Sequence, residues 1–403
     1  MKILWIKTDF LHPTTRGGQI RTLEMLRRLH ARHEVYYIAF DDPEHPEGLQ
    51  RAGEYSTRAY PIRRQVASKR SPRFLIDLLR GLVSPLPVAV ERYRSAEMRR
   101  LISSLRTREN FDSIVCDFLA PAPNIDDLSR CVLFQHNVET TIWQRHHQHA
   151  PDPLRRAYLG MQARKMFAYE RQVCRAVSHV IAVSDADSEL MRSMFGVESD
   201  AVPTGVDIQY FTPPADTPDA PAADLVFLGS MDWLPNIDGV KWFTAEILPL
   251  IRGRRPECTV AIVGRKPGPD IVSLAGGGIQ VTGTVPDVRP YLWGACVSIV
   301  PLRIGGGTRL KIYESMAAGT PVVSTTVGAE GLDVQSPANI LIADTPQAFA
   351  DACLRLLEDT RERRRMAAAA HELVSARFSW EAVADRFEAA LEAGAMQAGM
   401  SPR

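Results

Sequence analysis

The sequence lacks the features that would place the protein across a membrane, outside the cell or on nucleic acid. No segment holds 18 apolar residues without a charge, so we expect no membrane-spanning helix. Residues 1–7 lead to Asp9 without the long apolar core of a signal peptide. The six cysteines are far apart and form no Cys-x-x-Cys pair, which is typical of reduced core cysteines. A net charge of +1 gives no overall attraction for nucleic acid. Together these absences predict a cytoplasmic protein.

The composition is that of an ordinary globular protein with more than one domain. A chain of 403 residues, 45% hydrophobic and 24% charged, is too long for a single core. Apolar strand-like runs alternate with helical stretches, which is typical of parallel sheets covered by helices. These runs lie at residues 3–6, 34–40, 113–116, 131–134 and 179–183, and again at 225–228, 259–263, 279–281, 297–300, 322–324 and 340–342.

A segment with four prolines, 210–223, separates the two halves and reads as a linker. We predict an α/β protein with two Rossmann-like doubly wound domains, at residues 1–209 and 224–379. The C-terminal helix, 380–403, is expected to pack back on the first domain. Two such domains facing each other across a cleft would bring the carboxyl ends of both sheets to one ligand.

The segment 301–314 carries the strongest functional pattern. An apolar strand leads into three consecutive glycines, Gly305, Gly306 and Gly307, which allow the backbone to approach a ligand closely. Thr308 is placed to cap the following helix, whose first N–H groups favour an anion. The pattern therefore predicts a site for a diphosphate.

Three charged residues at the start of this helix strengthen the prediction. Arg309 and Lys311 add positive charge beside the anion, and Glu314 is free to accept hydrogen bonds from a sugar hydroxyl. A plainer interpretation stays open, in which the glycines only make a turn and Lys311 pairs with Glu314 on the helix surface.

Four further segments resemble sequence blocks of one known family. Residues 313–323 resemble its Glu-Ala-Met-Ala-x-Gly-x-Pro-Val-Val block, and residues 327–332 continue it. Residues 202–207 resemble its Pro-Asn-Gly-Val-Asp segment, and residues 180–184 its strand-and-cap signature. On these segments the chain resembles the glycosyltransferases of the GT-B fold, in particular the large retaining group called family 4. The resemblance covers nearly the whole chain and implies transfer of a sugar from a nucleotide sugar, with UDP or GDP as the expected nucleotide.

The resemblance also assigns residues of the second domain. Glu314 matches the second glutamate of the family's Glu-x7-Glu pattern, which implies contact with the ribose of the donor. The first glutamate would fall at Gly306, so we expect the backbone amides of Gly305 to Thr308 to replace part of its contacts with the donor sugar. The missing glutamate is the main departure from the family.

A second departure concerns the diphosphate. The family's Gly-Arg-Leu…Lys clamp is absent, and Gly229-Ser230 begins the segment that stands in its place. We therefore hypothesise that Arg309 and Lys311 supply the missing charge. Three more residues, Gly264, Arg265 and Val285, are expected to border the pocket for the base, although each segment is also explained as a plain turn.

In the first domain the resemblance selects two places. Gly17 and Gly18 lie in the first strand-to-helix turn and resemble the family's glycine-rich loop, which implies that they face the donor phosphates and the acceptor. His136 follows the strand 132–134 and resembles the family's active-site histidine. Because packing explains a polar group at a strand's carboxyl end poorly, we favour a functional role for His136.

The expected chemistry needs neither a metal nor an enzymic nucleophile. In a retaining transferase of this kind, amides and cations stabilise the leaving diphosphate, and we expect Arg309 and Lys311 to be those cations. Asp185 and Asp187 form an Asp-x-Asp pattern, but they follow Ser184 as a helix-start signature, so a metal site is not expected there. The histidines of segment 146–149 are read as a surface loop.

One region has an anomalous charge. Residues 51–110 hold 14 Lys or Arg against five acidic residues, which favours either a solvated basic insert or contact with an anionic membrane. The predicted function is sugar transfer to a glycan, lipid-linked or small-molecule acceptor in surface polysaccharide synthesis. A sugar-nucleotide epimerase or hydrolase on the same scaffold, or a non-catalytic donor-binding protein, remains an alternative.

Overall fold

The structure is a computed structural model that describes residues 1–14, 17–63, 84–148, 150, 152–215, 223–304, 309–397 and 399. Its contacts divide the chain into two units. Unit 1 contains Met1–Thr204 and Val383–Arg403, and unit 2 contains Gly205–Ala382. Each unit has one sheet of parallel strands with helices on both faces, which confirms the predicted α/β fold class.

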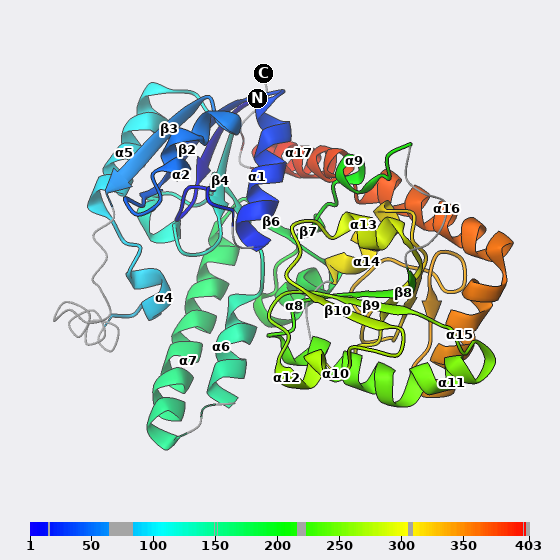
Figure 1. Ribbon diagram of the computed structural model, residues 1–403. Helices are drawn as coiled ribbons and strands as arrows, with labels where there is room; N and C mark the ends of the chain where they lie inside the picture. The colour runs from blue at the N-terminus through cyan, green and yellow to red at the C-terminus, as the bar shows by residue number, and fades with distance from the viewer. Residues whose placement is uncertain are drawn as a thin grey trace. The chain divides into compact units, whose positions relative to one another are not determined.

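Unit 1 is built on a parallel sheet with the strand order β3-β2-β1-β4-β5-β6-β7 among the described residues (Figure 1). The strands form because short apolar runs can be buried on both faces at once; β1, β4 and β5 are buried along nearly their whole length. Their bounds are β1 Lys2–Ile6, β2 Glu34–Asp41, β3 Arg58–Arg63, β4 Ser113–Asp117, β5 Cys131–Phe134, β6 His179–Ala182 and β7 Asp200–Ala201.

Three helices of unit 1 begin where a polar side chain caps them. Ser95, Asp152 and Ser184 each accept a hydrogen bond from a backbone N–H of the first turn of α5, α7 and α8. Helices α6 and α7 lie side by side as a hairpin in Figure 1. The bounds are α1 Gly17–His30, α2 Glu47–Gln50, α4 Val88–Glu91, α5 Ala96–Arg108, α6 Glu139–Gln148, α7 Pro153–Ala176 and α8 Asp185–Phe195.

The last helix, α17 (Trp380–Gln397), returns to the sheet of unit 1. The ring of Phe387 lies 5.6 Å from that of Trp5 on β1 and 4.8 Å from that of Phe134 on β5. Arg32, just beyond α1, donates a hydrogen bond to Asp385 at 2.7 Å. These contacts explain why the C-terminal residues belong to unit 1 although they follow unit 2 in sequence.

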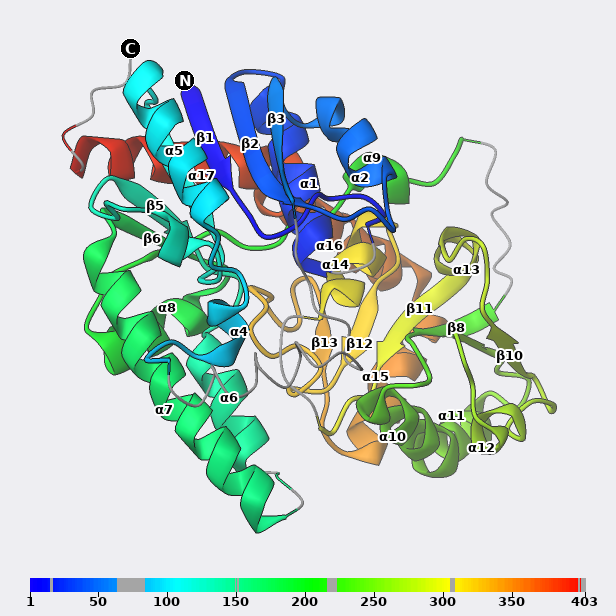
Figure 2. The same ribbon diagram turned by 90° about the vertical axis from the view of Figure 1, so that its left-hand side faces the viewer.

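Unit 2 has a second parallel sheet, with the order β10-β9-β8-β11-β12-β13 in the described part of the chain (Figure 2). Alternate residues of β8 enter different cores: Leu225 and Phe227 face the core under η3, α11 and α15, while Val226 and Leu228 face the core under α13, α14 and α16. The strands are β8 Ala223–Leu228, β9 Val260–Val263, β10 Ile279–Gly283, β11 Ala295–Val300, β12 Val322–Ser324 and β13 Leu341–Ile342.

The helices of unit 2 are α9 Ile208–Phe211, α10 Leu234–Trp242, the π-helical turn η3 Phe243–Ile247, α11 Leu248–Arg254, α12 Pro269–Val272, α13 Arg289–Trp293, α14 Leu310–Ala317, α15 Pro346–Glu358 and α16 Thr360–Arg377. The segment predicted as a linker, 210–223, begins inside α9, and its residues 216–222 lie outside the described residues. Within the described residues, no helix has the length and apolar character needed to cross a bilayer.

Candidate functional site

Two glycines stand side by side where β8 and β9 end. Leu228 pairs with Val263 in the parallel register, so Gly229 and Gly264 are the next residues along both strands. A Cβ atom on Gly264 would overlap the carbonyl oxygen of Gly229. Only glycine fits at position 264, and this glycine pair, Gly229 and Gly264, brings two strand ends together at the carboxyl edge of the sheet.

Lys311 on α14 reaches this glycine pair. Its Nζ donates a hydrogen bond to Asn236 Oδ1 at 2.9 Å and lies 4.6 Å from the centre of the Phe227 ring. A Cβ atom on Gly229 would lie 2.8 Å from this ammonium. Burial lowers the pKa of Lys311 to about 7, against the opposing charge of Glu314. The side chain is therefore a half-buried cation at a strand edge.

Two further charged residues, one just before α14 and one within it, lie close to Lys311. Arg309 is 5% exposed, and its guanidinium lies 5.1 Å from the centre of the Trp233 ring, with a pKa lowered by burial. Burial raises the pKa of Glu314, and the charge of Lys311 opposes this shift. The prediction that Thr308 caps this helix is wrong, because α14 begins at Leu310 and its N-cap residue is Arg309. The predicted loop Gly305, Gly306, Gly307 and Thr308 lies outside the described residues.

The structure brings Ser230 and Arg265 to the same edge. Arg265 Nε donates a hydrogen bond to Ser230 Oγ at 2.8 Å, and both side chains also approach Asp232. Lys266 follows with a φ of 55°, a left-handed conformation that is uncommon outside glycine. Val285, in contrast, packs against the core under α13 and α14. The glycine pair, Ser230, Arg265 and Lys311 therefore form one cluster.

In unit 1 the carboxylate of Asp117, at the end of β4, organises a buried polar network. Its Oδ2 accepts hydrogen bonds from Lys7 Nζ at 2.9 Å, Thr22 Oγ1 at 2.8 Å and Trp5 Nε1 at 3.0 Å. Its Oδ1 lies 2.7 Å from His136 Nε2. Burial acts to raise the pKa of Asp117, but the interactions with Lys7 and His136 outweigh it and keep this pKa well below its usual range.

His136 uses both ring nitrogens inside this network. Arg21 can only donate, and its NH1 lies 3.1 Å from His136 Nδ1, so Nδ1 is the acceptor and Nε2–H donates to Asp117. The ring stacks on Phe118 with centroids 3.9 Å apart. Burial lowers the pKa of His136 to about 3, against the charge of Asp117. A neutral, 3% exposed imidazole in this position suits a positioning role better than proton transfer.

The two glycines predicted in unit 1 differ in their surroundings. A Cβ atom on Gly18 would lie 3.0 Å from the Phe118 ring and 3.7 Å from His136 Nδ1, whereas one on Gly17 would meet no atom within 4 Å. The structure therefore brings Gly18 to His136 and leaves Gly17, the first residue of α1, facing open space.

Comparison with known proteins gives one answer for both units. Residues 15–210 match the family described as Glycosyltransferase Family 4, and residues 222–359 match Glycosyl transferases group 1. The chain belongs to the family 4 type of GT-B glycosyltransferases. The predicted family and the predicted GT-B fold are thus confirmed.

Individual relatives are distant. A D-inositol 3-phosphate glycosyltransferase of Nocardioides sp. is 29% identical over 247 residues, which are 53% of each chain. The chain therefore spans about half the length of that relative. An uncharacterised 44.6 kDa protein of the cps region of Klebsiella pneumoniae is 20% identical over 87% of this chain and 89% of its own length. Among solved structures, TarM superposes with a TM-score of 0.64 at 13% identity, covering 97% of this chain and 99% of its own.

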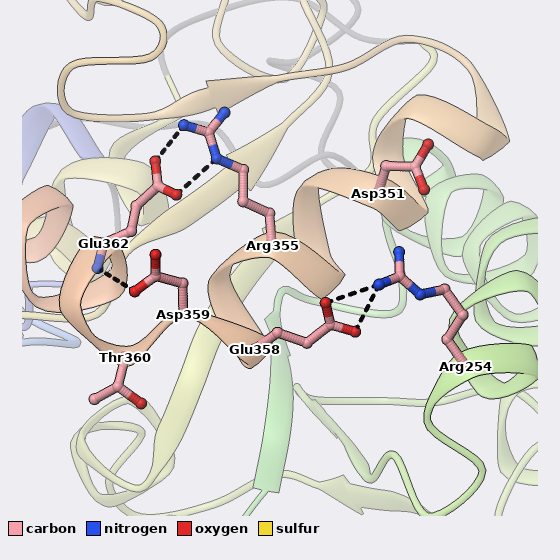
Figure 3. Close-up of a pocket in the computed structure, with 7 residues that line it drawn as sticks. All are labelled: Arg254, Asp351, Arg355, Glu358, Asp359, Thr360 and Glu362. Atoms are coloured by element: carbon pink, nitrogen blue, oxygen red, sulfur yellow. Dashed lines mark hydrogen bonds and ion pairs between the residues drawn. The ribbon is translucent and has the colours of Figure 1, made fainter.

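A surface hollow elsewhere in unit 2 of this GT-B chain differs from the Lys311 cluster in its charge pairing. Figure 3 shows Arg355 facing Glu362 and Arg254 facing Glu358 in the hollow between α11, α15 and the start of α16. Arg254 NH2 lies 2.8 Å from Glu358 Oε2. Both arginines of this hollow already pair with carboxylates. The hollow therefore provides little positive charge for binding a phosphate group.

Four polar residues of this GT-B chain lie beside the predicted ones but were not predicted from the sequence. Lys7, Arg21 and Asp117 surround His136, and Asn236 holds Lys311. Lys7 and Asp117 carry a recognisable signal, since each stands at the carboxyl end of a buried strand. Asn236 carries none, because its partner is 75 residues away in sequence.

The predictions about metals rest on capping geometry. Asp187 N donates to Ser184 Oγ at 3.1 Å, so the Asp-x-Asp pattern does lie at the start of α8. Among the described residues, no group of three or more His, Cys, Asp or Glu side chains is placed to hold a metal ion. His146 and His147 belong to α6 rather than to the predicted loop, because the helix continues to Gln148.

Proposed function

We propose that the protein transfers a sugar from a nucleotide-sugar donor to an acceptor hydroxyl, and that unit 2 binds the diphosphate of the donor. The observation that carries this proposal is Lys311, a half-buried ammonium held at the carboxyl edge of a parallel sheet, where such sheets bind ligands. Its partner in the protein is a neutral amide, so its charge is available to an anion. Arg309, two residues earlier, adds a second cation.

UDP and GDP are the nucleotides that we propose for the donor. HepE of Anabaena, whose solved structure is described as a complex with UDP, superposes with a TM-score of 0.62 at 14% identity over 97% of this chain. A relative from Corynebacterium glutamicum is named as a GDP-mannose-dependent mannosyltransferase and is 26% identical over 54% of this chain. Both names support a nucleoside diphosphate. Glu314 is assigned to the ribose, and Ser230, Gly264, Arg265 and Val285 to the surroundings of the diphosphate and the base.

The proposed reaction retains the anomeric configuration and uses neither a metal nor another cofactor. The bond between the anomeric carbon and the diphosphate oxygen breaks, and the acceptor oxygen bonds to the same face of that carbon. The acceptor proton passes to the departing diphosphate. Negative charge grows on the diphosphate as its bond breaks, so Lys311 and Arg309 stabilise the transition state more than the ground state. We assign His136, Gly17 and Gly18 of unit 1 to the acceptor side.

For the acceptor we propose a glycan, lipid-linked or small-molecule substrate of surface polysaccharide synthesis. The Klebsiella relative of the cps region and a Rhizobium meliloti relative named as a lipopolysaccharide core mannosyltransferase support this class. We also propose that the protein is cytoplasmic and touches the inner membrane face through the basic region 51–110. Residues 64–83 of that region lie outside the described residues, while α5 contributes exposed arginines such as Arg99. A flotation assay with anionic vesicles tests this membrane contact. A protein that does not float with the vesicles would contradict the proposed contact.

The experiment for the main proposal measures nucleotide release from UDP- and GDP-sugars, with and without a set of glycan and inositol acceptors. We expect release that depends on the acceptor and a glycosylated product. Release without an acceptor would instead identify a hydrolase, and interconversion of the sugar an epimerase. Binding of the donor without turnover would identify a non-catalytic protein.

A further inference from the structure

We propose that Asn236 is a positioning residue of the donor site, whose side-chain amide holds the Lys311 ammonium over the glycine pair while leaving its charge free for the diphosphate. The inference rests on the proposed function, because it deepens the role of Lys311. It adds a residue whose effect on the donor passes entirely through Lys311.

The orientation of the Asn236 amide is fixed by the backbone. Asn236 lies in the first turn of α10 and is 3% exposed. Its Nδ2 donates a hydrogen bond to the carbonyl oxygen of Ser230 at 2.8 Å. Since Nδ2 is engaged there, Oδ1 is the atom that points to Lys311 Nζ, 2.9 Å away. One amide therefore ties the segment after β8 to the side chain from α14.

Gly229 leaves room for the contact between the side chains of Asn236 and Lys311. A Cβ atom at this position would lie 2.6 Å from Asn236 Nδ2 and 2.8 Å from Lys311 Nζ. Any larger residue would separate the amide from the ammonium. The glycine that the sequence pattern predicts for the donor thus serves a second purpose, which is to let Asn236 reach Lys311.

The Asn236 amide is neutral, whereas an aspartate of nearly the same shape at this position would carry a negative charge. In the described part of the chain, the charged groups that act on Lys311 come from its own segment, namely Glu314 three residues later and Arg309 two residues earlier. The other elements packed against it supply the Phe227 ring, the Gly229 backbone and the Asn236 amide, none of which is charged. A neutral acceptor at 2.9 Å holds the ammonium in place without neutralising it, whereas a carboxylate would compete with the diphosphate. The lowered pKa of Lys311, about 7, agrees with a cation that has no ion-pair partner at α10.

Three variants of the full-length protein test the inference. Asn236→Asp is nearly isosteric and turns the contact into an ion pair, and Asn236→Ala removes it. Asn339→Ala is the matched control, because Asn339 is also buried in unit 2 and accepts a hydrogen bond from the backbone of Gln335. Thermal unfolding of each variant reports whether it folds.

The first readout is the pH dependence of Lys311 acylation by acetic anhydride, followed by mass spectrometry of the peptide between pH 6 and pH 10. We expect the midpoint to rise by about one pH unit or more in Asn236→Asp, because the added carboxylate favours the charged amine. It should stay in place in Asn339→Ala. An unchanged midpoint in a folded Asn236→Asp protein overturns the inference, whatever nucleotides the protein binds.

The second readout is calorimetric titration with UDP and with GDP at pH 7. If the inference holds, Asn236→Asp and Asn236→Ala weaken the binding seen in the wild type about tenfold, and Asn339→Ala leaves it within about twofold. Binding that is equally tight in both Asn236 variants overturns the positioning role. A wild-type protein that binds neither nucleotide, yet shows the midpoint shift, contradicts the proposed donor while supporting the placement of Lys311 by Asn236.

Discussion

Each unit places a lysine beside an aromatic ring near the carboxyl end of its sheet, but the two lysines have different partners. Lys7 in unit 1 lies 4.4 Å from the Phe118 ring and donates to the carboxylate of Asp117, with 1% of its side chain exposed. Lys311 in unit 2 lies 4.6 Å from the Phe227 ring and donates to an amide. The carboxylate supplies a countercharge to Lys7, whereas the neutral amide supplies none to Lys311. This difference is our reason for placing donor binding in unit 2.

The largest effect should come from breaking the ion pair of unit 1. Replacing Asp117 by Ala leaves Lys7 buried without its countercharge and removes the acceptor of His136. We expect the free energy of unfolding to fall by about 3–5 kcal/mol, which urea denaturation at pH 7 would measure. Asp126→Ala is the control: its exposed carboxylate pairs with Arg99 at 2.7 Å, and such pairs contribute about 0–1 kcal/mol. Equal losses in the two variants would contradict the structural role of Asp117.

Replacing Lys311 by Ala should act on the ligand instead of the fold. A charge-assisted hydrogen bond contributes about 1.5–3 kcal/mol, so we expect UDP or GDP to bind about 10-fold to 150-fold more weakly at pH 6.5. Isothermal titration calorimetry measures this change. Lys241→Ala is the matched control, because Lys241 lies on α10 of the same unit and is half-exposed and paired with Asp270. A Lys311→Ala protein that binds as tightly as the control would place the diphosphate elsewhere.

The strands and the glycines at their ends were easier to predict from the sequence than the side chains that meet there. The strands were predictable because runs such as 3–6 and 297–300 are apolar and contain β-branched residues. Gly229, Gly264 and His136 were selected through the resemblance to the family. The partners were not predictable. Lys7 and Asp117 are 110 residues apart, and Asn236 and Lys311 are 75 apart, so the order of strands in each sheet decides which side chains meet.

Lys311 should also give donor binding its own pH dependence. Its pKa in the free protein is lowered to about 7, so the ammonium is present below pH 7 and is lost as the pH rises through that value. A bound diphosphate favours the charged form, and affinity should therefore fall by up to about tenfold per unit between pH 7 and pH 9. Lys311→Arg keeps its charge over this range and corrects for titration of the nucleotide itself. If wild type and Lys311→Arg give parallel profiles, Lys311 does not titrate on binding.

The smallest expected effect concerns Glu139, at the start of α6 beside the His136 segment. Burial, aided by the nearby charge of Glu170, raises its pKa to about 7. A carboxyl whose pKa is higher in the folded than in the unfolded chain lowers stability as the pH rises from about 4.5 to about 7, since ionisation is harder in the fold. Glu170 is itself held by backbone N–H groups of Glu139 and Thr140, so both carboxylates crowd one helix start.

Glu139→Gln removes this ionisation and should stabilise the protein at pH 8 relative to pH 5. The gain should be on the order of 1 kcal/mol, because the side chain is only half-buried and its charge also interacts favourably with the N-terminus of α6. Urea midpoints at the two pH values measure it. Glu97→Gln, at the exposed first turn of α5, is the matched control for the helix position without burial. A gain of equal size in both variants would mean that the helix terminus, rather than the crowding of Glu139 and Glu170, sets the effect.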